Sequence, residues 1–441
     1  MDTVLLARLQ FALTISFHYL FPPLTIGLGV LLAAMEGLHL KTGDALYRRM
    51  SEFWARVLGL TFAMGVATGI VMEFEFGTNW AAYSRFVGDV FGSPLAAEAV
   101  LAFFLESVFL AVVLFGRDKV GPVLYFLSTV LVAFGAHLSA FWIIVANSWQ
   151  QTPAGFRIVG EGAAARAEIV DFWAMVFNPS TVDRFTHTIV GAWQSGAFLV
   201  VSVSAFYLLM RRHEAFAKAS LKFGLALALL ASLSQLETGH MSTLGVAKNQ
   251  PAKFAAIEAH YEKSAPAPLH LIGWVDAKNE RVRGLAVPGL ASFLLSGDPH
   301  RPVTGLRAFP PQDRPPVAAV FLTHHMMVSI GMALIGLSLL GVFFWRRGTL
   351  YEQTWLLLLY LPSFLLPQAA NQLGWQAAEV GRQPWLVYNL LRTSEGVSKV
   401  VPAGHILFSL LLFTLVYAGL FLVYAYLLAA KVLHGPEEAR S

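Results

Sequence analysis

The sequence predicts an all-α polytopic membrane protein with nine transmembrane helices. Of its 441 residues, 56% are hydrophobic and only 13% are charged. The apolar residues gather in runs of about 20 or more, which is the length that a helix needs to cross a hydrocarbon core. The predicted spans are residues 10–39, 54–75, 94–115, 122–146, 186–210, 219–240, 317–345, 354–379 and 403–431.

Basic residues follow every second span, as at Lys41, Arg117, Arg211 and Arg346. Loops rich in Lys and Arg lie on the cytoplasmic side of membrane proteins. The pattern therefore predicts an N-terminus outside and a C-terminus in the cytoplasm.

A long extra-membrane loop, residues 241–316, separates spans one to six (residues 1–240) from spans seven to nine (residues 317–441). It holds ten of the 21 prolines. A structureless loop of this length is usually functional or disordered, and it is short for an independent domain.

The composition also excludes several kinds of chemistry. With no cysteine in the chain, iron–sulfur clusters, thiolate ligands, disulfides and covalent c-type haem are ruled out. The formal net charge of +4 is too small to indicate a nucleic-acid partner. A redox metal would need His, Met, carboxylate or a cofactor ring.

Ionisable residues inside the spans are the strongest functional signal, because a charge at the bilayer centre costs roughly 2.5–3.5 kcal/mol. They are His18, Glu98, Glu106, His187 and Glu379. Such residues normally face a bundle interior and serve protons, ions or a metal. Under the predicted topology all except Glu106 lie in the outer half of the membrane, as do Met327 and Trp375.

Two helices carry candidate haem ligands. Imidazole and thioether hold low-spin haem iron in many cytochromes, which suits His187 and Met327. Taken alone, Met327 is more simply a core residue, and His187 is either a ligand or a hydrogen-bonded interior histidine. His324 and His325 compete with Met327. His18, four residues before Pro22, is either a ligand or a partner for a carbonyl that the proline frees.

The glutamates have both functional and structural interpretations. Glu98 and Glu106 are about 80° apart around a regular helix and about 12 Å apart along it, which suits successive stations on a proton path; the alternative is two protonated, hydrogen-bonded carboxyls. Glu379 shares a helix face with Trp375. Arg382 could neutralise a haem propionate or pair with Glu379, and the alternative is a helix end with a surface ion pair.

Lys253 and Glu258 frame the segment KFAAIE in the long loop. An acid and a base near the membrane edge could take protons from a hydroquinone. From the residues alone, a solvated charged face is the simpler interpretation.

Together with the motifs that surround them, these residues resemble the large haem-bearing subunit of cytochrome bd-type quinol oxidases over almost the whole length of the chain. Several long motifs in order make the resemblance specific. They are RLQFALTISFHYLFPPLTIG, GVATGIVMEFEFGTNW, PLAAEAVLAFFLESVFL, LSAFWIIVANSWQ, FTHTIVGAWQSGA, KFAAIE and EVGRQPW.

The resemblance implies a low-spin haem b, a high-spin haem b and a haem d, or a third haem b in its place. His187 and Met327 match the low-spin ligands, and His18 and Glu379 match ligands of the two high-spin haems. Trp375 matches a residue between cofactors, and Glu98 matches a residue at or beside the high-spin irons.

Other positions match proton and quinol residues of the family. Glu106 matches a proton-path residue, and Ser139 and Asp118 extend that path. Lys253 and Glu258 match the residues that bind quinol in the long loop, known as the Q-loop. His325 stands where some members carry an arginine, and the Q-loop is short, as in the cyanide-insensitive branch.

The resemblance therefore implies a terminal oxidase of the bacterial plasma (inner) membrane. It would oxidise ubiquinol or menaquinol at the outer face and reduce O2 to water with cytoplasmic protons. A second integral membrane subunit is expected, and in some members a small single-helix subunit. The rival hypothesis is a proton-coupled transporter or channel that uses the glutamates within the membrane.

Overall fold

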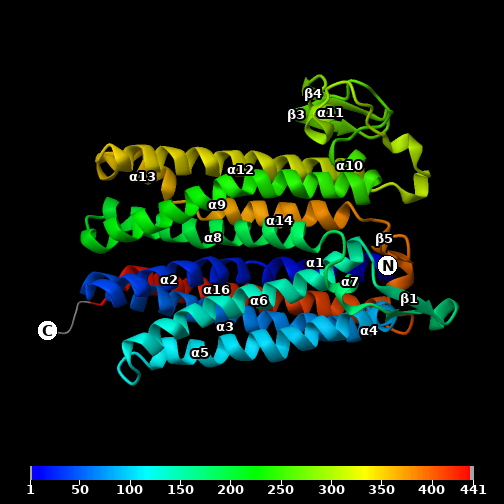
Figure 1. Cartoon of the computed structure of the whole chain (residues 1–441). Coiled ribbons are helices and arrows are strands. Elements are labelled where there is room, and N and C mark those ends of the chain that lie inside the picture. The colour runs from blue at the N-terminus through cyan, green and yellow to red at the C-terminus, as the bar shows by residue number, and fades with distance from the viewer. Residues whose placement is uncertain (1, 438–441) are drawn as a thin grey trace.

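The computed structural model describes residues 2–437 as long helices that lie side by side (Figure 1). The start of α1 and the end of α16 lie at opposite ends of this bundle. The polytopic all-α prediction is therefore confirmed. The main helices are α1 (Thr3–His18), α2 (Pro22–Thr42), α3 (Ala45–Gly77), α4 (Ala81–Ala97), α5 (Phe104–Phe115), α6 (Pro122–Gln151), α8 (Thr181–Leu209), α9 (Glu214–Asn249), α12 (Val317–Arg346), α13 (Thr354–Tyr360), α14 (Leu365–Val380) and α16 (Ala403–His434).

Within the described residues, eight helical segments are long and apolar enough to cross a membrane. The predicted count of nine is not confirmed, because the expected span 354–379 is divided into α13 and α14. The break falls at Pro362, whose ring cannot donate to a helix carbonyl. Side-chain hydroxyls take over: Ser363 donates to the carbonyl of Tyr360 at 2.8 Å, and Ser202 of α8 donates to the carbonyl of Leu361.

The first predicted span is also broken. His18 is the last residue of α1, and residues 19–21 form a tight turn before Pro22 opens α2. The amides of Leu20 and Phe21 bond carbonyls three residues back, at Phe17 and His18. The proline pair thus ends one helix and starts another, where the sequence analysis expected one continuous span.

The third span begins earlier than predicted. The helix starts at Ala81 and runs through Pro94, so Glu98 lies near its middle and not at its start. Polar residues of α4 hide this part of the helix from a hydropathy search. After Pro94 the helix passes through one π-helical stretch, Glu98–Phe103, before α5.

The long loop is ordered. Helix α9 continues to Asn249, beyond the predicted limit of 240, and stops before Pro251. Residues 250–316, called here the loop segment, contain α10 (Pro251–Ile257), a β-hairpin of β3 (Leu269–Asp276) and β4 (Arg281–Val287), α11 (Leu290–Ser296) and the short helices η3 (Leu306–Ala308) and η4 (Pro311–Asp313). The hairpin lies beside α12 (Figure 1).

An apolar cluster joins the loop segment to the bundle. Ala255, Ile257 and Leu306 of the loop segment pack with Val320 and Phe321 of α12. Short elements at the same end of the molecule complete the structure: β1 (Phe156–Val159), η2 (Gly162–Ala164), β2 (Arg166–Ile169), α7 (Phe172–Val176), β5 (Trp385–Val387), β6 (Leu391–Arg392) and α15 (Thr393–Gly396), while η5 (Leu350–Glu352) precedes α13.

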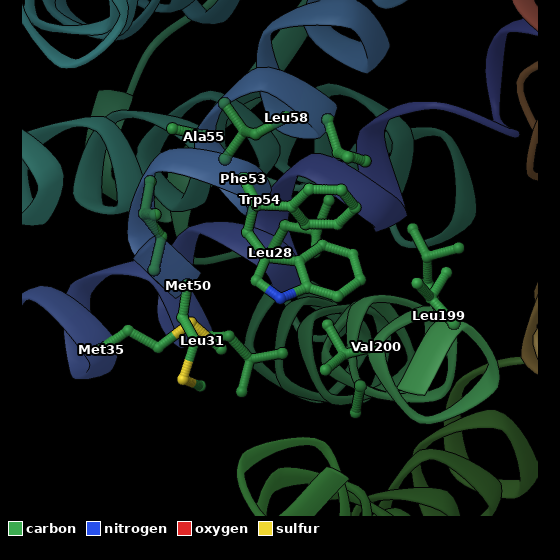
Figure 2. Packing of buried hydrophobic residues seen from close by; sticks show 14 of the residues in the cluster. Leu28, Leu31, Met35, Met50, Phe53, Trp54, Ala55, Leu58, Leu199 and Val200 are labelled. Atoms are coloured by element: carbon green, nitrogen blue, oxygen red, sulfur yellow. The ribbon is translucent and has the colours of Figure 1, made fainter. Parts of the chain in front are cut away.

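The largest core lies where α2, α3 and α8 meet, around the fully buried Trp54 (Figure 2). The backbones of α2 and α8 touch at Gly27 and Gly196. A Cβ at Gly196 would lie 2.4 Å from the carbonyl carbon of Gly27. Small residues of this kind let membrane helices approach closely, so the pair fixes how α2 and α8 cross.

We therefore predict that Gly196→Val lowers the free energy of unfolding of the detergent-solubilised protein by about 1–3 kcal/mol, the usual cost of overpacking. The matched control is Gly331→Val in α12, where a Cβ meets no atom within 4 Å. Thermal unfolding followed by tryptophan fluorescence measures both. Equal melting temperatures for the two variants would contradict the close-packing argument.

Candidate functional site

His187 lies in the first third of α8 and faces α9. Its Nδ1 is 3.2 Å from the hydroxyl of Thr238, and the amide nitrogen of Gln235 lies 3.2 Å from both ring nitrogens. A Cβ at Gly239 would touch the imidazole at 3.4 Å. Gln235, Thr238 and Gly239 share one face of α9 and thus form a polar, close-fitting surface for this ring.

Met327 lies on α12 against α14, where a Cβ at Gly374 would come within 2.6 Å of the thioether sulfur. The two neighbouring histidines differ in whether their ring nitrogens already have hydrogen-bond partners. His325 stacks on Phe321, and its ring nitrogens contact main-chain oxygens of Phe321 and His270 at 2.9 and 2.7 Å. Nδ1 of His324 is buried without a partner among the described residues. His325 is therefore occupied, whereas His324 and Met327 both remain candidate ligands.

His18 faces α3 at the point where α1 ends. Its Nδ1 lies 3.0 Å from the hydroxyl of Thr68, and a Cβ at Gly69 would be 3.2 Å from the ring. Thr68 is fully buried. The ring is thus held between helices beside an irregular turn.

Glu98 and Glu106 lie on the segment that contains the π-helical stretch. Glu98 begins this stretch and accepts a hydrogen bond from Ser139 of α6 at 2.6 Å. Glu106 is buried against α6, where a Cβ at Gly135 would lie 3.0 Å from the Cβ of Glu106. A π turn holds more residues than an α turn, so the two carboxyls lie closer to one helix face than the predicted 80° offset. Asp118 lies beyond α5 and pairs with Arg48 at 3.1 Å.

Glu379, at the end of α14, is surrounded by donors. Arg382 pairs with its Oε2 at 2.6 Å, and Asn147 and Gln151 of α6 donate to its Oε1 at 3.1 Å each. Arg184 of α8 lies 3.8 Å away. The surface ion pair considered from the sequence is a buried network, since Arg382 is 5% exposed. Trp375 lies one turn earlier on α14.

Lys253 joins the same network from α10. Its Nζ donates to the side-chain oxygens of Gln151 and Gln250 at 2.8 and 2.9 Å, and its side chain packs on Gly381. Burial, reinforced by the nearby Arg184, holds the pKa of Lys253 well below its ordinary value. We call Glu379, Arg382, Arg184, Lys253, Asn147 and Gln151 the outer cluster.

Glu258 ends α10 and is also buried, at 5% exposed. Its Oε2 has no hydrogen-bond partner among the described residues. Burial raises the pKa of Glu258 to about 7. The solvated charged face is therefore wrong for both Lys253 and Glu258, because α10 turns these residues inward against the bundle.

Sequence reasoning missed two charged residues, Arg184 and Glu75. Arg184 lies just before the apolar run of its helix and looked like a loop residue. Glu75 was quoted only within a motif, yet it is 2% exposed and accepts a hydrogen bond from Thr14 at 2.6 Å. Its position in a span was the signal that could have identified it.

Comparison with known proteins identifies the family. The model of cytochrome bd terminal oxidase subunit I matches residues 6–436. The chain belongs to this family. Cytochrome bd ubiquinol oxidase subunit 1 of Bacillus subtilis (strain 168) is 39% identical, covering 99% of this chain and 95% of the relative. Cytochrome bd-II ubiquinol oxidase subunit 1 of Escherichia coli (strain K12) is 34% identical, covering 100% and 98%.

The fold agrees with this assignment. The structure of bd oxidase from Geobacillus thermodenitrificans superposes with a TM-score of 0.91 at 28% identity, covering 99% of both chains. The chain is thus a multi-pass membrane subunit of a quinol oxidase in the respiratory chain, and the family implies haem cofactors. The transporter hypothesis is wrong.

We predict that His187→Ala removes the low-spin haem signal and leaves the high-spin signals largely intact, because the imidazole is the candidate ligand. Met327→Leu should do the same. Reduced-minus-oxidised visible spectra of the purified oxidase measure the outcome. His325→Ala is the matched control, since both nitrogens of that ring face main-chain oxygens. An unchanged low-spin spectrum in His187→Ala would overturn the ligand assignment.

Proposed function

We propose that this subunit oxidises quinol beside α10 and transfers the electrons to haems held by α1, α8, α12 and α14. The observation that carries the proposal is the hydrogen-bonded link from Lys253 through Gln151 to Glu379. A buried base in the loop segment is thereby connected to a carboxylate that is a candidate haem ligand. Quinol chemistry and haem chemistry would meet at this cluster.

The residues fit haem on two grounds. The outer cluster holds three basic side chains and one carboxylate, and Nε of Arg184 has no partner among the described residues. Such an excess of buried donors suits anionic propionates. In addition, Gly69, Gly239 and Gly374 each stand where a Cβ would touch a candidate ligand.

We assign the low-spin haem b to His187 and Met327, with His324 as the rival to Met327. His18 and Glu379 would hold the high-spin haems, one of type b and the other a haem d or a third haem b. Trp375 would lie between cofactors, and Glu98 at or beside the high-spin irons. When bound, the haems supply one-electron transfer and the site where O2 is reduced to water.

Quinol oxidation releases two protons, and Glu258 is suited to accept one of them. An acceptor works best with a pKa near the working pH, and burial gives Glu258 this property. Lys253, whose pKa is depressed, can receive the other. A polar cavity of about 20 Å³ between Gln151, Arg184 and Gln250 is large enough for one water molecule that could carry protons outward.

Protons for O2 reduction would come from the opposite end of the bundle. Asp118 lies at that end, Glu106 is buried farther along the helix, and Glu98, which accepts a hydrogen bond from Ser139, lies beyond Glu106 in the same direction. Carboxyl and hydroxyl groups can pass protons in sequence. The reaction would then move charge across the membrane without a separate pump.

This assignment requires the loop segment on the outer side, with the N-terminus outside and the C-terminus in the cytoplasm of a bacterial plasma membrane. A second integral membrane subunit would complete the enzyme, and a small single-helix subunit could join it. Relatives named as ubiquinol and menaquinol oxidases both match this chain, so either quinol is a candidate substrate.

We predict that Glu258→Gln abolishes most quinol oxidase activity but leaves O2 consumption with an artificial donor that reduces the haems directly. The amide keeps the shape of the side chain but cannot accept a proton. Oxygen-electrode assays with the two donors measure the separation. Glu262→Gln, an exposed position on the same loop segment, is the control. Equal losses with both donors would mean that Glu258 is not at the quinol site.

The same residue predicts a pH dependence. Only the ionised carboxylate accepts a proton, so kcat/KM for quinol should rise with pH through about 7, the raised pKa of Glu258. The inflection should disappear from the residual activity of Glu258→Gln. Initial rates across this pH range measure it. An inflection that persists in the variant would assign the titration to another group.

We also predict that Glu106→Gln slows O2 reduction and leaves haem reduction by quinol intact, because an amide cannot relay a proton. Stopped-flow spectra separate the two half-reactions. The control is Glu214→Gln, an exposed carboxylate paired with Lys218 at the start of α9. Wild-type turnover and charge translocation in Glu106→Gln would count decisively against the path.

A further inference from the structure

The outward face of the β3–β4 hairpin is unusually apolar. Antiparallel pairing places Ile272 opposite Leu285 and Trp274 opposite Arg283, so these four side chains share one face. Ile272, Trp274 and Leu285 are 68%, 68% and 62% exposed. A hairpin covered on one side normally presents polar residues on the other. On this face the charged residues gather at the turn end, where Asp276 pairs with Arg281 at 3.3 Å and lies 4.0 Å from Arg283, and the rest of the face is apolar.

The opposite face of the hairpin already has its packing partner. Val275 and Val282 are paired across the strands and pack on the cluster that joins the loop segment to α12. The exposed apolar face therefore cannot be buried by turning the hairpin over, because that would expose the two valines. Its cover must come from outside the described chain.

The depth of the hairpin identifies the surroundings of this face. A ring nitrogen of His325 contacts the carbonyl of His270 in β3 at 2.7 Å, which fixes the hairpin beside α12. A span of about 20 residues crosses the hydrocarbon core, and counted back from Arg346 it ends near Met326. The base of the hairpin thus lies at the level of the outer lipid headgroups.

Exposed apolar residues of α12 lie at the same level as the hairpin, close to the contact between His325 and His270. Leu322, Met326 and Val328 of α12 are 52%, 45% and 46% exposed beside the hairpin. Tryptophan is enriched at this level of membranes. Arg283, opposite Trp274, has a long apolar stem that can lie along lipid. Its guanidinium lies 4.0 Å from Asp276 and, with the side chain 58% exposed, can also reach phosphate.

We propose that the β3–β4 hairpin is a membrane-contact element, with Ile272, Trp274 and Leu285 inserted into the interface of the outer leaflet. The occupant of the face is lipid, and Arg283 contacts anionic headgroups. The polar turn that holds Lys278 and Asn279 stays in water. The loop segment is thereby attached to the bilayer beside α12, in addition to its packing on the bundle.

Site-directed spin labelling tests this proposal, and the natural absence of cysteine makes the chain a ready background. The complete oxidase, reconstituted in nanodiscs of zwitterionic and anionic phospholipid, carries one label at Ile272→Cys or Leu285→Cys. Lys278→Cys in the hairpin turn is the matched control. Power saturation then compares collisions with O2, which concentrates in lipid, and with a water-soluble nickel chelate.

The expected result is that O2 collisions exceed nickel collisions at positions 272 and 285, and that the order is reversed at position 278. Nickel dominance at all three positions would overturn the proposal, because the face would be in water. Protection from both reagents at positions 272 and 285 would also overturn it, because a second subunit or a second copy would then cover the hairpin. The haem spectrum confirms that each labelled oxidase is folded.

Discussion

The ion pair between Glu379 and Arg382, at 2.6 Å, is the interaction on which the candidate site depends. A buried charge without its partner costs several kcal/mol, whereas a paired and hydrogen-bonded one is tolerated. Glu379 meets this requirement only if α6 supplies two amide donors and α8 brings Arg184 near. Because Lys253 bonds the same glutamine of α6, α10 is held in the same arrangement. The loop segment and the candidate haem helices are therefore positioned together.

Irregular helix geometry accompanies the proposed functional residues. The turn after α1 follows His18 directly, and the π-helical stretch begins at Glu98. A regular helix uses its own carbonyls and fixes each side chain by a constant rotation. An inserted or missing residue changes that rotation and redirects the side chains beyond it. In this chain each irregularity stands near a proline, at Pro22 and at Pro94, so proline is the local cause available in the sequence.

Hydropathy predicted the membrane class and most spans because bilayer thickness sets helix length. Hydropathy failed where a helix is too polar to be detected and where a predicted span is interrupted. Helix α4 is polar enough to escape detection, and the predicted span 354–379 breaks at Pro362 into α13 and α14. The ionisable candidate ligands could be recognised from the sequence, because such residues are costly inside a membrane span and usually serve a function there. The burial of Lys253 could not be recognised from the sequence. Nothing in KFAAIE shows that α10 packs inward, because this contact arises only from tertiary structure.

A comparison of the two ends of the bundle explains why the outer cluster, and not another buried ion pair, suits anionic cofactors. At the opposite end Glu36, 1% exposed, receives both terminal nitrogens of Arg117 at 2.8 Å and the hydroxyl of Ser51. Glu52 lies 3.6 Å from the same guanidinium, so carboxylates match or exceed the cations there. That network ties α2 and α3 to the turn after α5, and although Nε of Arg117 has no hydrogen-bond partner among the described residues, its charge is balanced by the carboxylates around it. The outer cluster has one carboxylate among three basic side chains, and its unbalanced donors can be satisfied by negative charge from a bound group.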